Sequence, residues 1–501
     1  MDFWSRADNP TTGMGTVSPF SALGYVTTPV VTATTDLSVF TSDEIRALTN
    51  KQIAALTTTQ VAAIATDAMA GLAARQITAL GTRGTTALTT EQFHALSTTQ
   101  LAAFNKTQAA AFSSTQLNAL ASDQLAGLGA TQIGALSTAA VAGLDTSLLT
   151  HLSGTQVRAL TTVQVVALSS AQIAALGTDQ IASLKVSQVK AIETADIQAL
   201  TSDQIVALSR AQVTSLSLGQ VAALQASQIT AIEVADVTAL SPAQLSHLST
   251  TQVQALSTGQ LSVFSRGAIA AFSTTAAAAL TSSQLRALGS MQLAGLTSAQ
   301  IVALSSDAFD AFETSQFASL SVKQVAAIET DDIASLSTDK IAALTSQQTA
   351  SLTTAQVRAL TDAQIAAIET GDLAAFRRTQ WEALTPEQVH AFSTDQIASL
   401  KRAQIATLST SSIAALATEQ LGALSAPQLQ GLSTVQVAAL TSDQLAALTT
   451  DQFVALRGDQ LAGIAADTFA GLTTDQMAAL TPDQIGRIRT DRKSTRLNSS
   501  H

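Results

Sequence analysis

Paired carboxylates recur in this sequence at one spacing and are the first residues that could bind a metal ion. Each pair is a Glu followed three residues later by an Asp, and the four pairs are Glu193/Asp196, Glu233/Asp236, Glu329/Asp332 and Glu369/Asp372. Stacked carboxylates could hold Ca²⁺, but Ca²⁺ takes six to eight oxygen ligands, usually from a glycine-containing loop. No such loop accompanies these pairs. We therefore interpret them as helix starts, where acidic side chains interact favourably with the helix dipole.

Histidine and arginine side chains provide the other candidate sites. The histidines of the repeated region have no partner at the i, i+4 spacing of helical metal ligands, and they are His94, His151, His247 and His390. We expect no metal or haem site from them. Arg377 and Arg378 near Trp381 could form a nucleic-acid or partner patch, but one basic spot in an acidic chain is more typical of a solvated turn. No Ser/His/Asp grouping or glycine-rich phosphate loop stands out, so we expect neither catalysis nor a cofactor.

An eight-residue repeat, the octad, sets the positions of all these residues. Every residue whose number is a multiple of eight from Phe40 to Ile488, 57 positions in all, is Leu, Ile or Phe. If that residue is position 8, the consensus is S/T-S/T-x-Q-I/V/L-x-A-L, with a second apolar residue at position 5. On one continuous helix the pattern would drift by about 80° per octad, and on a strand positions 5 and 8 would face opposite sides. The pattern therefore predicts a short helix that carries both apolar residues on one face, followed by a break.

Each octad also begins with a helix-start signal. Position 1 is mostly Ser or Thr, and position 4 is Gln in 41 of the 56 octads between residues 41 and 488, which together make a capping box. Pro242, Pro386 and Pro482 all fall at position 2, the first helical residue, where proline is tolerated. Position 7 is nearly always Ala, Gly or Ser, which would let neighbouring helices approach closely. Each octad is predicted to be a helix of about two turns, roughly 10 Å long, that ends in a sharp bend.

A helix this short cannot be stable alone. Ordering eight residues costs about 12 kcal/mol, whereas burying two large apolar side chains returns about 3–6 kcal/mol. We therefore predict an all-α solenoid, or superhelix, over residues 41–488, with one very short helix per octad and each octad stabilised by adjacent ones. The Glu/Asp pairs recur 40, 96 and 40 residues apart, which suggests a super-repeat of five octads. Three octads without the box could be soft points or kinks: 81–88, 145–152 and 273–280, with Gly84, Leu148 and Ala276 at position 4.

The repeated Gln and Ser/Thr side chains are the one extended polar feature of the array. They could form a regular ladder that binds a ligand, but capping alone explains them and is the interpretation we favour. On that interpretation, replacing one of these glutamines by alanine, for example Gln252, costs about 1 kcal/mol or less.

The flanks of the array differ from it in composition. Residues 1–39 carry prolines, threonines and aromatic residues without a secretory signal pattern. We interpret them as a flexible leader, with a hydrophobic cap on the first octads as the alternative. Residues 491–501, DRKSTRLNSSH, resemble the translation of a sequencing-library adapter, which implies that they are not native and that the natural chain continues. Without these eleven residues the chain has 22 basic and 35 acidic residues, a net charge of −13.

The composition excludes two further classes of protein. The chain has no cysteine, so it has neither a disulfide framework nor a thiolate metal site. It also has no run of 18 apolar residues, so we expect no segment to span a membrane.

Two short segments resemble the opening helix of transcription activator-like effector repeats: LTPDQIGRI at 480–488 and LTTTQVAAIAT at 56–66. In that family a second helix follows, and the residues after the first helix read a DNA base. Here the next octad begins at once, so the base-reading loop and the second helix are missing. The acidic net charge also opposes binding to phosphates. We attribute this resemblance to shared helix-start chemistry and do not expect nucleic acid as a partner.

The whole array is similar, in composition and repetition, to long, cysteine-free, Thr/Ala-rich bacterial repeat proteins that carry haemagglutinin or haem-utilisation labels. This resemblance implies a non-enzymatic structural protein, either an adhesin-like stalk or an interaction module, that is secreted or exposed on the cell surface. A protein or a cell surface would then be its partner. The alternative is an intracellular scaffold that binds protein, or less readily nucleic acid, along the groove of the superhelix.

Overall fold

A computed structural model describes residues 28–488 of the chain. The chain falls into two compact units, Met1–Leu240 (unit 1) and Ser241–His501 (unit 2), which we describe separately. Between residues 28 and 488 both units consist of very short helices, and that part of the chain contains no strand. The prediction of an all-α fold with one short helix per octad is therefore confirmed.

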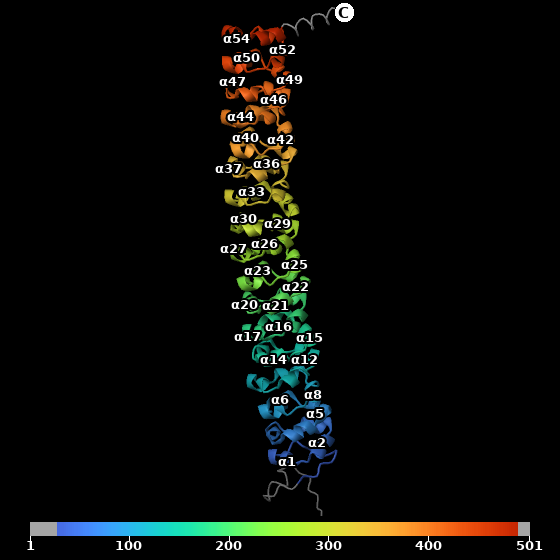
Figure 1. Cartoon of the computed structure of the whole chain (residues 1–501). Coiled ribbons are helices and arrows are strands. Elements are labelled where there is room, and N and C mark those ends of the chain that lie inside the picture. Colours follow the sequence, from blue (N-terminus) through green and yellow to red (C-terminus); the bar gives the residue numbers. More distant parts are fainter. Residues whose placement is uncertain (1–27, 489–501) are drawn as a thin grey trace, which may run out of the picture. The chain divides into compact units, whose positions relative to one another are not determined.

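The bounds of the helices follow the octad. Unit 1 runs from α1 (Ser42–Ala47) to α24 (Val234–Val237), and unit 2 runs from α25 (Pro242–Ser246) to α54 (Thr474–Ala478) (Figure 1). Each α-helix has four to seven residues, begins at position 2 of its octad and ends at position 5, 6 or 7. Only α5 (Gly81–Ala87) among these helices begins at position 1, and the octad before α4 (Ala74–Ala79) forms a 3₁₀ helix, η2 (Asp67–Gly71).

The predicted capping boxes set the start of most helices. In α35 (Val322–Val325), the Gln324 amide N–H donates to the Ser321 hydroxyl at 3.3 Å, and the Ser321 amide N–H donates to Oε1 of Gln324 at 2.8 Å. The bend between helices lies at positions 8 and 1. Leu256 and Ser257, for example, both have extended backbone, with ψ of 126° and 155°. Two consecutive extended residues end one helix and turn the chain before the next helix begins.

Positions 5 and 8 form the core of each unit. In unit 2, Val253 at position 5 is fully buried and Leu256 at position 8 is 3% exposed, and most other octads repeat this arrangement, although Met477 and Ile485 at position 5 are exposed. Octads with a small residue at position 5 lie beside aromatic side chains. Ala109 shares its octad with Phe112, whose ring packs edge-on against that of Phe104 with centroids 5.1 Å apart. The bulky ring of Phe112 at position 8 thus compensates for the small side chain of Ala109 at position 5.

Helices that lie three octads apart in the sequence pack against one another. In unit 1, α14 (Gly154–Ala159) packs against α11 (Ala130–Ile133) and α17 (Thr178–Ser183), which lie three octads before and after it (Figure 1). One turn of the coil therefore takes between three and four octads. Adjacent octads also meet in the core, as the rings of Phe104 and Phe112 do, but the helix-to-helix packing joins octads three apart. The bend at positions 8 and 1 carries successive helices around the turn, so the packing partners come from the turns before and after.

Position 7 is small because it faces the preceding turn. A Cβ added to Gly127, at position 7, would lie 3.0 Å from Cβ of Thr98, which is at position 2 three octads earlier. Small residues at position 7 therefore permit the close approach of successive turns, as the sequence predicts.

The three octads that we interpreted as soft points still form helices, namely α5, α13 (Thr146–Leu149) and α29 (Thr274–Ala278). In the first of them Gly81 has φ of 60°, a conformation that favours glycine, and this allows α5 to follow α4 directly. In the second, Oδ1 of Asn118 accepts the Asp145 amide N–H at 3.1 Å and so replaces the missing glutamine as the cap acceptor. The octads that we interpreted as soft points therefore keep their helices, and only the groups at the helix starts differ.

Residues 28–40 precede the first octad and contact the start of unit 1. Leu37 is fully buried. Nε2 of Gln52 donates to the Pro29 carbonyl at 2.5 Å, and Nε2 of Gln60 donates to the Thr32 carbonyl at 2.8 Å. This part of the leader therefore contacts the first octads of unit 1. The remainder of the leader, and the adapter-like segment 491–501, lie outside the described residues.

A circular dichroism spectrum of residues 41–488 is expected to be strongly helical, because nearly every octad contributes one helical segment. The short length of each helix should weaken the 222 nm band relative to long helices of the same helical content. A spectrum dominated by β-structure would contradict this fold.

Candidate functional site

The glutamine at position 4 is the most regular polar group in the described structure, and it is buried. Gln356 is 2% exposed. Its Oε1 accepts the Thr353 amide N–H at 2.8 Å, and its Nε2 donates to the carbonyls of Val325 at 2.9 Å and Ile328 at 2.7 Å. These carbonyls lie 31 and 28 residues earlier, at positions 5 and 8 of the fourth preceding octad. We call this arrangement a glutamine stitch.

A glutamine stitch uses every hydrogen-bonding function of one amide. The oxygen caps its own helix, and the nitrogen joins that helix to the preceding turn, where the carbonyl of position 8 would otherwise be buried without a donor. The capping interpretation of the sequence is therefore confirmed but incomplete. The ligand ladder is wrong for the glutamine row, since these side chains are buried.

One signal in the sequence points to the stitch. A capping box accepts Glu as readily as Gln, because only the side-chain oxygen is used. Position 4 nevertheless holds Glu only once, at Glu44. Glu44 lies in the first octad, where it accepts the Thr41 amide N–H at 2.9 Å and no fourth preceding octad exists to receive a donor. The choice of Gln over Glu elsewhere reflects the need for the N–H₂ group.

The Glu/Asp pairs replace the stitch by a different bond between turns. Oδ1 of Asp196 accepts a hydrogen bond from the Ser170 hydroxyl at 2.5 Å, 26 residues earlier. The same bond joins Asp332 to Ser306 at 2.6 Å and Asp372 to Ser346 at 2.5 Å. The glutamates of the pairs are exposed, and no cluster of three potential metal ligands occurs between residues 28 and 488. The structure therefore brings three of the four aspartates to serines, and it does not bring the carboxylates together in a cluster of three.

The four candidate histidines are exposed and belong to four different octads. Nδ1 of His94 bonds to the Ala119 carbonyl at 2.8 Å, and Nδ1 of His390 bonds to the Ala415 carbonyl at 2.9 Å, both 25 residues later in the chain. A carbonyl only accepts, so these bonds require the proton on Nδ1. His247 bonds within its own helix, to the Ala243 carbonyl at 2.8 Å. Two of the histidines thus join successive turns.

His94 also lines an open groove of about 700 Å³ on unit 1. The other residues of the groove are Thr66, Asp67, Thr90, Glu91, Ala95 and Ala119. The Glu91 backbone amide, with the Thr89 and Thr90 hydroxyls, holds the pKa of the exposed Glu91 carboxyl below its usual value. The groove lies beside η2, the one octad that forms a 3₁₀ helix.

The basic pair near Trp381 does not form a base-stacking surface. Trp381 is 1% exposed and packs edge-on against Phe376, with ring centroids 5.5 Å apart. Arg378 is exposed, and its Nε donates to Oε1 of Glu382 at 2.7 Å. The arginines therefore lie at a solvated helix start, while the tryptophan belongs to the core.

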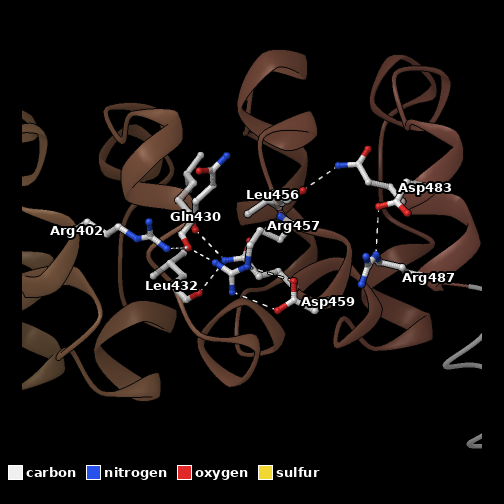
Figure 2. Close-up of polar contacts among 11 residues, drawn as sticks. Arg402, Gln430, Leu432, Leu456, Arg457, Asp459, Asp483 and Arg487 are labelled. Carbon is white, nitrogen blue, oxygen red and sulfur yellow. Dashed lines mark hydrogen bonds and ion pairs between the residues drawn. The ribbon is translucent and has the colours of Figure 1, made fainter.

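A second group of arginines, which sequence analysis did not single out, gathers in unit 2 (Figure 2). Nη2 of Arg402 donates to the Gln430 carbonyl at 3.4 Å, and Nη1 of Arg457 donates to the same oxygen. Arg457 also pairs with Asp459 at 3.2 Å, and its hydrogen bond lowers the pKa of that carboxyl. Because this pKa is lowered, the pair adds a small stabilisation at neutral pH that is lost as the pH falls through the carboxyl's titration. No repeat signal marks the group, since its members occupy different octad positions.

Lys340 occupies position 4 in place of glutamine and gives a direct test of the stitch. Its side chain is 8% exposed and its Nζ donates to Oδ1 of Asp310 at 3.0 Å, while α37 (Thr338–Ala342) has no side-chain cap bond. Lys340→Gln is expected to stabilise unit 2 by about 1–2 kcal/mol, because the amide can cap Ser337 and bond the preceding turn without burying a charge. Thermal melting measures this change. The control, Lys323→Gln on the exposed surface, should alter stability by less than about 0.5 kcal/mol, and a lower melting temperature for Lys340→Gln would contradict the role of the stitch.

One known family matches this chain. The model of the ALTTAQ repeat matches it in eight segments, namely 33–66, 154–186, 189–226, 229–266, 286–322, 325–362, 365–402 and 426–458. The matches that begin at 189 and 229, and at 325 and 365, are 40 residues apart, the spacing of the Glu/Asp pairs. No curated protein matches the sequence. The eight segments cover more than half of the chain, which therefore belongs to the ALTTAQ repeat family.

Proposed function

We propose that this protein is a non-enzymatic structural repeat protein, an adhesin-like stalk or interaction module that is secreted or exposed on the cell surface. The observation that carries the proposal is the glutamine stitch, repeated through both units with the same partners 28 and 31 residues earlier. Each helix packs against helices of the turns before and after it. Such a coil gains octads without any change in its packing, which suits a protein whose function depends on the length of its repeat array.

The polar groups of the array support the same proposal. The glutamines at position 4 are buried and engaged in holding turns together, so they do not form a reactive surface. None of the helices between residues 28 and 488 has the length and apolar character needed to cross a lipid bilayer. The net charge of −11 favours protein or cell-surface partners over nucleic acid, because phosphates are repelled by an acidic surface.

The location of the protein on its source cells tests the proposal. Intact cells are treated with a protease that does not cross membranes, and residues 41–488 are followed with an antibody. Loss of the array from intact cells supports a surface stalk. Protection until the cells are lysed would overturn it and favour the intracellular scaffold that binds protein along the superhelical groove.

A further inference from the structure

Two arginines from different turns of unit 2 converge on one backbone oxygen. Arg402 begins α45 (Arg402–Ile405), and Arg457 directly precedes α52 (Gly458–Ala462). Both guanidinium groups lie within hydrogen-bond distance of the Gln430 carbonyl, so the two donor nitrogens are at most about 7 Å apart (Figure 2). Two like charges held this close repel one another, and the Asp459 carboxylate offsets only one of them.

Glycines create the space in which this group of arginines packs. A Cβ added to Gly431 would lie 2.5 Å from Cγ of Arg402, and a Cβ added to Gly458 would lie 2.3 Å from Cδ of Arg487. These glycines stand at positions 7 and 2, where Ala and Ser or Thr are usual. The side chain of Arg402 therefore lies directly over the Gly431 backbone, and its direction is set by the missing methyl group.

The donors of this group are only partly used. A guanidinium carries five N–H donors in a fixed fork. Arg402 makes one long bond, at 3.4 Å, and is exposed. Nε and Nη2 of Arg457 donate to the two carboxylate oxygens of Asp459 at 3.2 and 3.3 Å, and Arg487 pairs with Asp483 at 3.2 Å (Figure 2). Three arginines and two aspartates leave a positive excess in a chain that is acidic as a whole, and the neighbouring Lys401 adds to it.

We propose that Arg402 and Arg457 form a binding site for one tetrahedral oxyanion, a phosphate or sulfate group carried by a partner molecule of this protein. One oxygen of such a group binds the guanidinium fork of Arg402, and another binds an N–H donor of Arg457 that Asp459 and the Gln430 carbonyl leave unused, each through charge-assisted hydrogen bonds. The oxyanion neutralises the charge that the two arginines concentrate beside the Gln430 carbonyl.

The test uses the full chain and the anions themselves as probes. Inorganic phosphate, sulfate and acetate are titrated in a calorimeter at constant ionic strength with chloride. Wild type is expected to bind phosphate and sulfate in the millimolar range, and Arg402→Gln should raise the dissociation constant at least fivefold. Arg358→Gln, an exposed arginine of α39 (Thr354–Ala359), should leave it unchanged. Equal loss in both variants, or no binding to wild type, would overturn the proposal.

A charge-neutral variant separates the site from general electrostatics. Gly431→Ala removes no charge but displaces the Arg402 stem, so it should weaken phosphate binding at least threefold. Its melting temperature shows whether the fold is kept, as the usual alanine at position 7 leads us to expect. Equal affinities for phosphate and sulfate would identify a site that accepts either oxyanion. A higher affinity for one of them would show which group the partner molecule carries. If acetate bound as tightly as phosphate, the site would not select a tetrahedral oxyanion over a carboxylate, and the proposal would be refuted.

Discussion

Replacing Gln284 by alanine is expected to destabilise unit 2 by about 3 kcal/mol, several times the cost of losing a simple helix cap. Gln284 is 3% exposed, its Oε1 accepts the Thr281 amide N–H, and its Nε2 donates to the carbonyls of Val253 and Leu256, both at 2.8 Å. Alanine leaves the Thr281 amide without its cap acceptor and the Leu256 carbonyl buried without its donor. Hydrogen exchange should therefore rise in two separate segments, 249–256 and 281–288.

Two matched variants isolate the donor function of that amide. Gln254→Ala removes an exposed glutamine at position 6 and should change stability by less than about 0.5 kcal/mol. Gln284→Glu keeps the cap acceptor but sets a carboxylate against two carbonyl oxygens. It should be more unstable at neutral pH than at pH 4, where the protonated acid can donate once. If Gln284→Ala and Gln254→Ala were equally mild, the bonds between turns would not stabilise the coil.

The local structure of each octad could be predicted from the sequence because its signals are local. Ser or Thr at position 1, Gln at position 4 and proline at position 2 act within one helix, and the helices begin where these signals place them. The partners in space could not be predicted in the same way. They depend on the rotation between successive helices, which follows from the backbone angles at positions 8 and 1, such as ψ of 126° at Leu256 and 155° at Ser257.

The polar candidates illustrate the same limit. Ser170 and Asp196 are 26 residues apart, and Arg402 and Gly431 are 29 residues apart. Neither spacing indicates a contact in space until it is known that one turn of the coil takes between three and four octads. The histidines are isolated in the sequence, and the bonds of His94 and His390 to carbonyls 25 residues later depend on the same turn.

Leu360→Asp is expected to open the turn of unit 2 that holds this residue, together with the turns before and after it. The free energy of unfolding should fall by about 4 kcal/mol. Leu360 is at position 8 and 3% exposed, and its carbonyl accepts from Nε2 of Gln388 at 2.7 Å. An aspartate there buries a carboxylate without a partner, which is far more costly than losing the apolar contact alone. Because octads three and four away supply the contacts, the loosened region should extend over about four octads on each side, roughly residues 321–392.

Limited proteolysis reads this outcome directly. New cuts should appear between residues 321 and 392, including octads far from 360 in sequence, while the segments on either side stay resistant. Leu360→Met keeps the volume and apolar character of the side chain, so it should cost less than about 1.5 kcal/mol and give the wild-type pattern. Cuts confined to the octad 353–360 would contradict this expectation, because a break in the stacking of turns must also expose the turns before and after it.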